Sequence, residues 1–248
     1  MHTITMLACL GLAIVCAQTQ AQTQDSSTDG ATPFKLTLGH YAYRNTQDSP
    51  RHDVGKDANL RWTQGDTHAW VGHYEDRSFG HQDRFGADTS WSVADGLALQ
   101  PSVQAASGGF RGGSLNAVLG TQTFGIVGWG RTNLKPYANL NFDPNDAVTL
   151  GLGHVFDNGQ TWSVTVIRDD RLHTGQTDRH LTGRIPMGED RLTVDLMYKT
   201  GRGDSGQVKA WAPSVTWDFP RWFLRFARDP KQGFTAQDAT RLSAGVRF

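Results

Sequence analysis

Basic side chains recur on one face of a series of alternating segments, and this spacing limits what chemistry the chain could do. In "RLTVDLMYK" (191–199), apolar residues occupy every second position and polar residues lie between them. Side chains of a strand point to opposite faces with period two, so the polar residues share a face. Across the chain this face has eight basic and three acidic members, which are Arg61, Arg84, Arg184, Arg191, Lys199, Arg225, Arg241 and Arg247, with Asp88, Asp195 and Asp218.

Two interpretations of this basic face are open. If the face lines a pore, rings or tracks of Arg and Lys favour anions, and the planar Arg fork matches carboxylate and phosphate groups. If the interior is narrow, the same residues could instead form a lattice of salt bridges, with Arg191 and Asp195 as one such pair. The chain as a whole has 24 basic and 24 acidic residues. This balance gives no bulk argument for nucleic-acid binding.

Two stretches about half a chain apart repeat the same polar pattern. "YEDRSFGHQDRF" (74–85) and "RDDRLHTGQTDRH" (168–180) each contain an acid–Asp–Arg triplet followed by a second Asp–Arg. One hypothesis is a paired ligand or lipopolysaccharide site built from Arg77, Arg84, Arg171 and Arg179. The simpler interpretation, which we favour, is two polar loops whose Asp and Arg side chains pair with one another.

An enzyme is not expected, although a hydrolase at the outer rim is an alternative. A hydrolase needs a base within hydrogen-bond reach of a nucleophile or water. The only close pairing in sequence is Ser78 with His81, and its spacing is not diagnostic. No strong metal spacing is present, so we expect no metal and no cofactor. The rim histidines and acids are His73, His81, His173 and His180, with Asp76, Asp83, Asp169 and Asp170.

The tripeptide Arg202-Gly203-Asp204 falls in a predicted outer loop, where it could act in adhesion. A three-residue match is common, and Gly and Asp are ordinary loop residues. An adhesive role therefore remains an alternative.

The elements that would position these side chains are strands. The last segment, "RLSAGVRF", places Leu242, Ala244, Val246 and Phe248 on one face and polar or small residues on the other. The segments 84–93, 97–105 and 161–169 show the same period, and none has helical spacing.

Connections between the segments alternate in length. Short turn signals lie near Gly65, Asp95, Asn158, Gly188 and Pro220, and longer polar stretches lie between them. This alternation predicts an up-and-down meander with tight turns at one end and loops at the other. Aromatic residues near strand ends favour a transmembrane barrel over a soluble sandwich. They are Trp62, Trp91, Trp162, Tyr198, Trp217, Trp222 and Phe248.

We therefore predict an all-β fold, a transmembrane up-and-down antiparallel β-barrel of about 14 strands. Single-chain barrels have even strand numbers. The count depends on 131–146, which we interpret as a long outer loop, and 12 strands is the alternative.

The N-terminal segment has the features of an export signal. The stretch Met6–Ala17 is apolar and has the length of a signal-peptide core. We predict a signal peptide over 1–21, cleaved after Ala17 or Ala21, a flexible polar linker over 22–33 and the barrel over 34–248. Both cysteines, Cys9 and Cys16, lie in the predicted signal, so the mature barrel has no disulfide. No apolar run reaches about 18 residues, so no transmembrane helix is expected.

The export signal, the cysteine-free body and the terminal "RLSAGVRF" together resemble a bacterial outer-membrane β-barrel protein. The stretch "HYEDRSFGHQDRFGAD" (73–88) is similar to small YaiO-like barrels, which does not assign a subfamily. The resemblance implies a monomer in the outer membrane of a Gram-negative bacterium, with membrane lipid and lipopolysaccharide around it. It also implies that the barrel assembly machinery recognises Leu242, Val246 and Phe248.

On this basis we expect a small channel for polar or anionic solutes through an Arg-rich lumen. A non-conducting structural or adhesion barrel with a salt-bridged interior is the first alternative, and an outer-membrane hydrolase is the second.

Overall fold

The computed structural model describes residues 32–45, 52–140, 143–171, 173–203 and 206–248. The predicted signal peptide with both cysteines, and most of the predicted linker, lie outside these residues. Within the described part of the chain, no helix is long and apolar enough to cross a membrane.

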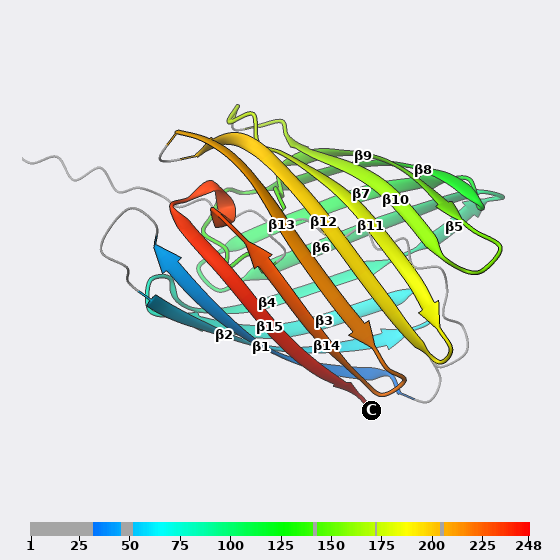
Figure 1. The fold of residues 1–248 in the computed structure, drawn as a ribbon, viewed down its shortest axis with the longest axis horizontal. Helices are drawn as coiled ribbons and strands as arrows, with labels where there is room; N and C mark the ends of the chain where they lie inside the picture. The colour runs from blue at the N-terminus through cyan, green and yellow to red at the C-terminus, as the bar shows by residue number, and fades with distance from the viewer. Residues whose placement is uncertain (1–31, 46–51, 141–142, 172, 204–205) are drawn as a thin grey trace, which may run out of the picture.

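The described chain is almost entirely strand (Figure 1). The elements are β1 (Phe34–Asn45), β2 (His52–Gln64), β3 (Thr67–Asp76), β4 (Gly80–Thr89), β5 (Trp91–Ala94), β6 (Leu97–Ala106), β7 (Phe110–Leu119), β8 (Thr123–Thr132), β9 (Ala147–Val155), β10 (Thr161–Asp169), β11 (Thr177–Met187), β12 (Asp190–Gly203), β13 (Gly206–Asp218), β14 (Trp222–Asp229), a short 3-10 turn η1 (Gln232–Phe234) and β15 (Gln237–Arg247).

These strands form one closed antiparallel barrel. Each strand pairs with its neighbours in sequence, and β1 also pairs with β15. The segments β4 and β5 are two parts of one strand interrupted at Ser90, because both pair with β6. The barrel therefore has 14 strands, which confirms the predicted fold class and count. The two ends of the sheet meet where the Phe34 and Phe248 backbones exchange hydrogen bonds of 3.0 and 2.9 Å.

The apolar faces point outward and the polar faces inward. In β15, Leu242 is 58% exposed, whereas Ser243 beside it is 1% exposed. The same reversal occurs around the barrel, where Val, Leu, Phe and Trp side chains make up most of the exposed exterior. Such an exterior needs an apolar surrounding, and a polar interior needs hydrogen-bonding partners. A barrel in a lipid bilayer provides both.

Aromatic side chains gather near the end of the barrel that carries the short turns, here called the turn end. Those on the outward face there include Phe34, Trp62, Trp91, Trp162, Trp217, Trp222 and Phe248. Tyr198 lies farther along, nearer the opposite or loop end, and its ring is 4.7 Å from that of Trp211. The predicted aromatic residues thus fall on two levels, as interface girdles do.

Three predicted long loops are shorter than expected, because the strands continue into them. Only residues 77–79 separate β3 from β4, and 107–109 separate β6 from β7. Arg202 and Gly203 lie within β12 rather than in an outer loop, and Asp204 lies outside the described residues. The prediction of a long connection within 131–146 is confirmed, but the prediction that it lies outside the barrel is wrong. It folds into the barrel instead of outward.

Candidate functional site in the barrel interior

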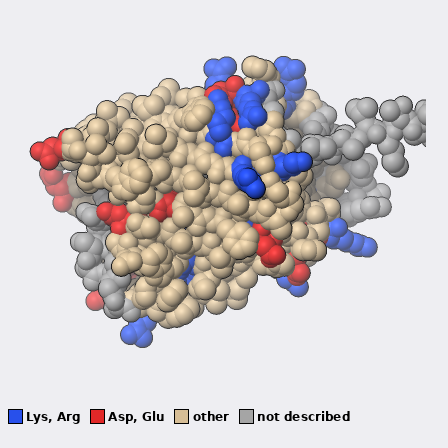
Figure 2. Space-filling view, turned by 180° about the vertical axis from the view of Figure 1, so that it is seen from behind, with Lys and Arg blue, Asp and Glu red and all other residues tan. Residues whose placement is uncertain are grey.

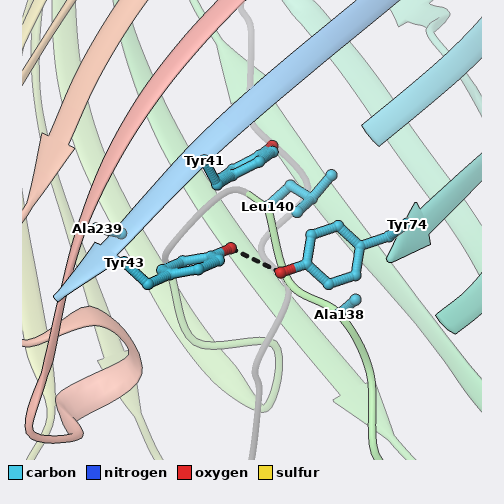
Figure 3. Close-up of a cluster of buried hydrophobic side chains, with 6 residues drawn as sticks. All are labelled: Tyr41, Tyr43, Tyr74, Ala138, Leu140 and Ala239. Atoms are coloured by element: carbon cyan, nitrogen blue, oxygen red, sulfur yellow. Dashed lines mark hydrogen bonds between the residues drawn. The ribbon is translucent and has the colours of Figure 1, made fainter. Parts of the chain in front are cut away.

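The segment 133–146, here called the inner loop, lies among the inward side chains of the loop end. Its residues 141 and 142 are not described. Tyr137, Ala138 and Leu140 are buried, as are Asp143 and Asp146. Figure 3 shows Ala138 and Leu140 of the inner loop beside tyrosines that project from the barrel wall. The inner loop therefore narrows the interior.

Gln82 on β4 holds the inner loop to the wall with both ends of its amide. Its Nε2 donates to the Pro136 carbonyl at 3.0 Å and to the Ser107 carbonyl at 3.0 Å. Its Oε1 accepts from the Ala138 amide at 2.8 Å. A buried strand side chain thus takes the place of the backbone partners that this irregular segment lacks.

Two of the predicted lumen residues also anchor the inner loop. Arg84 forms a buried ion pair with Asp57 and donates to the Ala138 carbonyl at 3.5 Å. Arg241 donates through Nη1 to the Leu140 carbonyl at 2.8 Å. Both side chains are buried, and both hold the inner loop to the barrel wall.

Three tyrosines fill the space between the inner loop and the wall of β1 to β3. The Tyr43 and Tyr74 hydroxyls hydrogen-bond at 2.7 Å (Figure 3), and Tyr41 meets Tyr74 edge to face with 5.9 Å between centroids. Gly55 provides the room for this packing, because a Cβ there would lie 2.7 Å from the Tyr74 hydroxyl and 2.9 Å from the Tyr43 ring.

On another side, Tyr137 of the inner loop packs on Phe110 of β7, with ring centroids 4.2 Å apart. Burial raises the pKa of the Tyr137 hydroxyl above its ordinary value. The hydroxyl therefore keeps its proton and donates to Gln104 Oε1 at 3.3 Å.

The wall of β11 to β14 contacts the inner loop through ionisable side chains. His180 links Asp143 of the inner loop, at 2.8 Å, to Asp195 of β12, at 3.0 Å. Close to these residues, Lys199 and Asp229 form a fully buried ion pair. Lys199 also donates to the Lys231 carbonyl at 2.9 Å. The predicted lumen residues Asp195 and Lys199 are thus parts of a network of interior ion pairs.

The five remaining predicted basic residues lie at the other end of the interior, with Asp88 and Asp218. Arg61, Arg184, Arg191, Arg225 and Arg247 point inward near the turn end, and Lys35, which sequence reasoning missed, joins them. The acidic partners on this level are Asp88 and Asp218. Arg61 lies 3.1 Å from Asp88, and Arg191 and Arg247 lie 3.4 and 2.6 Å from Asp218. Arg225 donates to Thr216 Oγ1 at 2.9 Å.

The interior residues that sequence reasoning missed lie on faces that it had already identified. Asp57 is two steps of two from Arg61, Asp178 is three steps of two from Arg184, and Asp229 is two steps of two from Arg225. Continuing the alternation along each strand would have found all three. The inner loop acids, Asp143 and Asp146, had no such signal, because they lie outside any strand.

The paired site hypothesised from the two repeated stretches is not assembled. Arg77 is exposed in the turn after β3, whereas Arg84 is buried inside the barrel. Arg171 contacts Asp146 at 2.8 Å, and Arg179 points outward and donates to Thr200 at 3.0 Å. Each arginine therefore has a separate environment.

The suggested pairing of Ser78 with His81 is also absent. Ser78 donates to Asp53 at 2.7 Å, and His81 stacks on His73 at 6.3 Å between centroids. His73 in turn lies 2.7 Å from Asp83. The Ser78 hydroxyl therefore contacts a carboxylate and not the His81 imidazole.

A small cavity remains between the inner loop and the wall of β6 to β9. Both polar atoms of the Asn145 side chain are buried there, and neither has a hydrogen-bond partner among the described residues. Gly130 allows the close approach, since a Cβ there would lie 2.4 Å from the Asn145 carbonyl. Arg131 is the one charged residue among the described residues of the cavity lining, and the other polar lining residues are Gln104, Ser114, Asn116, Thr132, Asn145 and Thr149.

Solved structures of outer-membrane barrels align with the chain. The Acinetobacter baumannii outer membrane protein Omp33 aligns with a TM-score of 0.54 at 10% identity, over 88% of this chain and 98% of that chain. The chain has the fold of an outer-membrane β-barrel. The NanC porin aligns at 0.48 with 8% identity, over 86% and 100%. A mutant of the Rh. blastica porin aligns at 0.45 with 10% identity, over 86% and 99%. No family model and no curated protein sequence matches this chain.

Proposed function

We propose that this barrel is a narrow channel in the outer membrane of a Gram-negative bacterium, that it passes small polar solutes and that it favours anions. One observation carries the proposal. Among the described residues, six basic side chains and two carboxylates face the interior near the turn end, and none of the six is fully buried. Basic groups in a confined, partly hydrated space attract anions over a short range.

The inner loop supports a narrow path rather than a wide one. Against β1 to β4 and β11 to β15 it is held by tyrosines, hydrogen bonds and ion pairs. Against β6 to β9 it leaves the cavity with amide and hydroxyl lining. We infer that a solute passes the inner loop on this side. A polar lining with few charges can replace the hydration of a small solute without binding it too strongly to leave.

A measurement in planar bilayers tests the proposal. In a salt gradient we expect discrete conductance steps and a reversal potential that indicates preference for anions. The double variant Arg184→Gln with Arg225→Gln should move the reversal potential toward cations, because it removes two inward charges. Lys56→Gln is the matched control, since Lys56 points outward and its side chain is 68% exposed. Cation preference in the unmodified protein would contradict the proposed selectivity.

A second candidate is a barrel that does not conduct. The buried lattice of the loop end favours it, because Arg84, Lys199 and Arg241 all have protein partners. The same bilayer recording separates the two candidates. If no discrete conductance is seen for protein that resists unfolding in unheated gel samples, the structural barrel is the better account.

A further inference from the structure

The outward face of the barrel carries a run of six basic side chains along one wall. They lie on β7, β8 and β10 to β13, each within the four residues nearest the loop end of its strand. This set, here called the basic belt, consists of Arg111, Arg131, Arg168, Arg179, Arg202 and Lys209. The strands β11 to β13 face the viewer in Figure 1, and Figure 2 shows the other side of the molecule, where the visible Lys and Arg side chains also gather mostly toward one end.

Acidic neighbours on the basic belt are few. Asp170 pairs with Arg131, through two hydrogen bonds of 2.7 Å. For Arg111, Arg168 and Arg179, no ion pair to an acidic side chain is present among the described residues. These three are also exposed. The wall therefore presents a net positive surface to its surroundings.

The opposite wall, at the same level, is electrically mixed. On β1 to β4 the outward residues near the loop end include Lys56 paired with Glu75 at 3.7 Å. His73 lies 2.7 Å from Asp83. Since positive and negative groups alternate there, this wall has no comparable excess of charge. The difference between the walls provides an internal control.

Directly toward the turn end from the basic belt, the exterior becomes apolar and aromatic. Trp129 is 52% exposed, and the Arg131 guanidinium lies 4.5 Å from the centroid of its ring. Arg179 is in register with Tyr198, whose ring packs against Trp211. Tyr and Trp rings mark the interface between acyl chains and headgroups. The basic belt is thus at headgroup level on the loop side.

We propose that the basic belt binds phosphorylated headgroups of the outer-leaflet lipid, as in a diphosphorylated lipid A. Arg pairs with phosphate through two parallel N–H···O bonds, so adjacent strands can hold several phosphate oxygens. The apolar wall below accepts the acyl chains of the same molecule. Charge complementarity and the adjoining apolar surface select a lipid over a soluble anion. This inference is independent of whether the barrel conducts.

The test uses the full-length barrel in neutral detergent micelles. Native mass spectrometry with added diphosphoryl lipid A should show bound lipid, with less binding for monophosphoryl lipid A and least for neutral phosphatidylethanolamine. The variant Arg168→Gln with Arg179→Gln should lose most of the diphosphoryl lipid A adduct. The control Arg44→Gln with Lys56→Gln changes two outward basic residues on the opposite wall and should retain it.

Three outcomes would overturn the proposal. They are equal binding of diphosphoryl lipid A and phosphatidylethanolamine, equal loss in both double variants, and displacement of the lipid by inorganic phosphate at the same concentration. A gel comparison of heated and unheated samples verifies that each variant is folded. Because these substitutions are at exposed positions, we expect all variants to fold.

Discussion

The barrel interior has two halves, one next to the turn end and one next to the loop end, and they differ in how far their charged side chains are buried. In the turn half, basic side chains outnumber carboxylates and stay partly exposed. In the loop half lie all the fully buried Asp, Lys and Arg residues among those described, six aspartates and three basic residues. They are Asp57, Asp143, Asp146, Asp169, Asp178 and Asp229, with Arg84, Lys199 and Arg241.

This difference follows from the inner loop. It fills most of the loop half, so an ionised group there needs a partner to offset the cost of desolvation. Asp178 is an exception, because neither of its carboxylate oxygens has a hydrogen-bond partner among the described residues. In the turn half the inner loop is absent, and water can solvate a guanidinium that has only one protein partner. The same residue type is therefore a structural element in one half and a candidate solute contact in the other.

The largest expected effect comes from breaking a buried pair in the loop half. Lys199→Met leaves the Asp229 carboxylate buried without its cation, and such changes cost about 3–5 kcal/mol. Urea titration in lipid vesicles, followed by tryptophan fluorescence, measures the free energy of unfolding. The variant Lys199→Met with Asp229→Leu removes both charges and should recover most of the loss. If Lys199→Met alone has the stability of the unmodified protein, the buried lattice does not stabilise the barrel.

The matched change in the turn half should be mild. Arg184→Gln removes a partly exposed charge, and surface-like substitutions of this kind stay within about 0.5 kcal/mol. The same urea titration compares it with Lys199→Met. If Arg184→Gln lowered the free energy of unfolding as much as Lys199→Met does, the two halves would not differ in hydration.

The sequence predicts the strands and the direction of their side chains because both depend on a local period of two. The predicted residues Arg61, Arg184, Arg191, Arg225 and Arg247 accordingly point into the barrel. The sequence does not predict the inner loop, because its position depends on contacts far apart in the chain. Gln82 and Ala138 are 56 residues apart, and Arg241 and Leu140 are 101 apart. No local pattern encodes such pairs.

A comparison of two single variants separates loop anchoring from selectivity. Arg241→Gln removes the hydrogen bond to the Leu140 carbonyl, and loss of a buried partner costs about 1–3 kcal/mol. We expect a looser inner loop and a higher, noisier single-channel conductance. Arg225→Gln lies in the turn half and should instead shift the reversal potential toward cations with little change in noise. Identical effects of the two variants would remove the functional distinction between the halves.

The smallest expected effect concerns the cavity between the inner loop and β6 to β9. Asn145 contributes an uncharged amide to its lining, and neither polar atom of that amide has a partner among the described residues. Asn145→Asp would place a carboxylate of nearly the same shape on the inferred path. A negative charge in a confined site repels an anion more strongly than one in bulk water, because the surrounding protein screens it less. We therefore expect a modest drop in anion conductance.

Asn145→Ala is the control, because it removes the amide without adding a charge. If the solute passes between the inner loop and β6 to β9, the Asp variant should reduce anion current while the Ala variant retains or increases it. Since the unpaired amide gains no internal hydrogen bond by being buried, its removal should leave the free energy of unfolding nearly unchanged. Equal currents for Asn145→Asp and the unmodified protein would place the path elsewhere in the interior. The basic turn half would then act as a vestibule to a different opening past the inner loop.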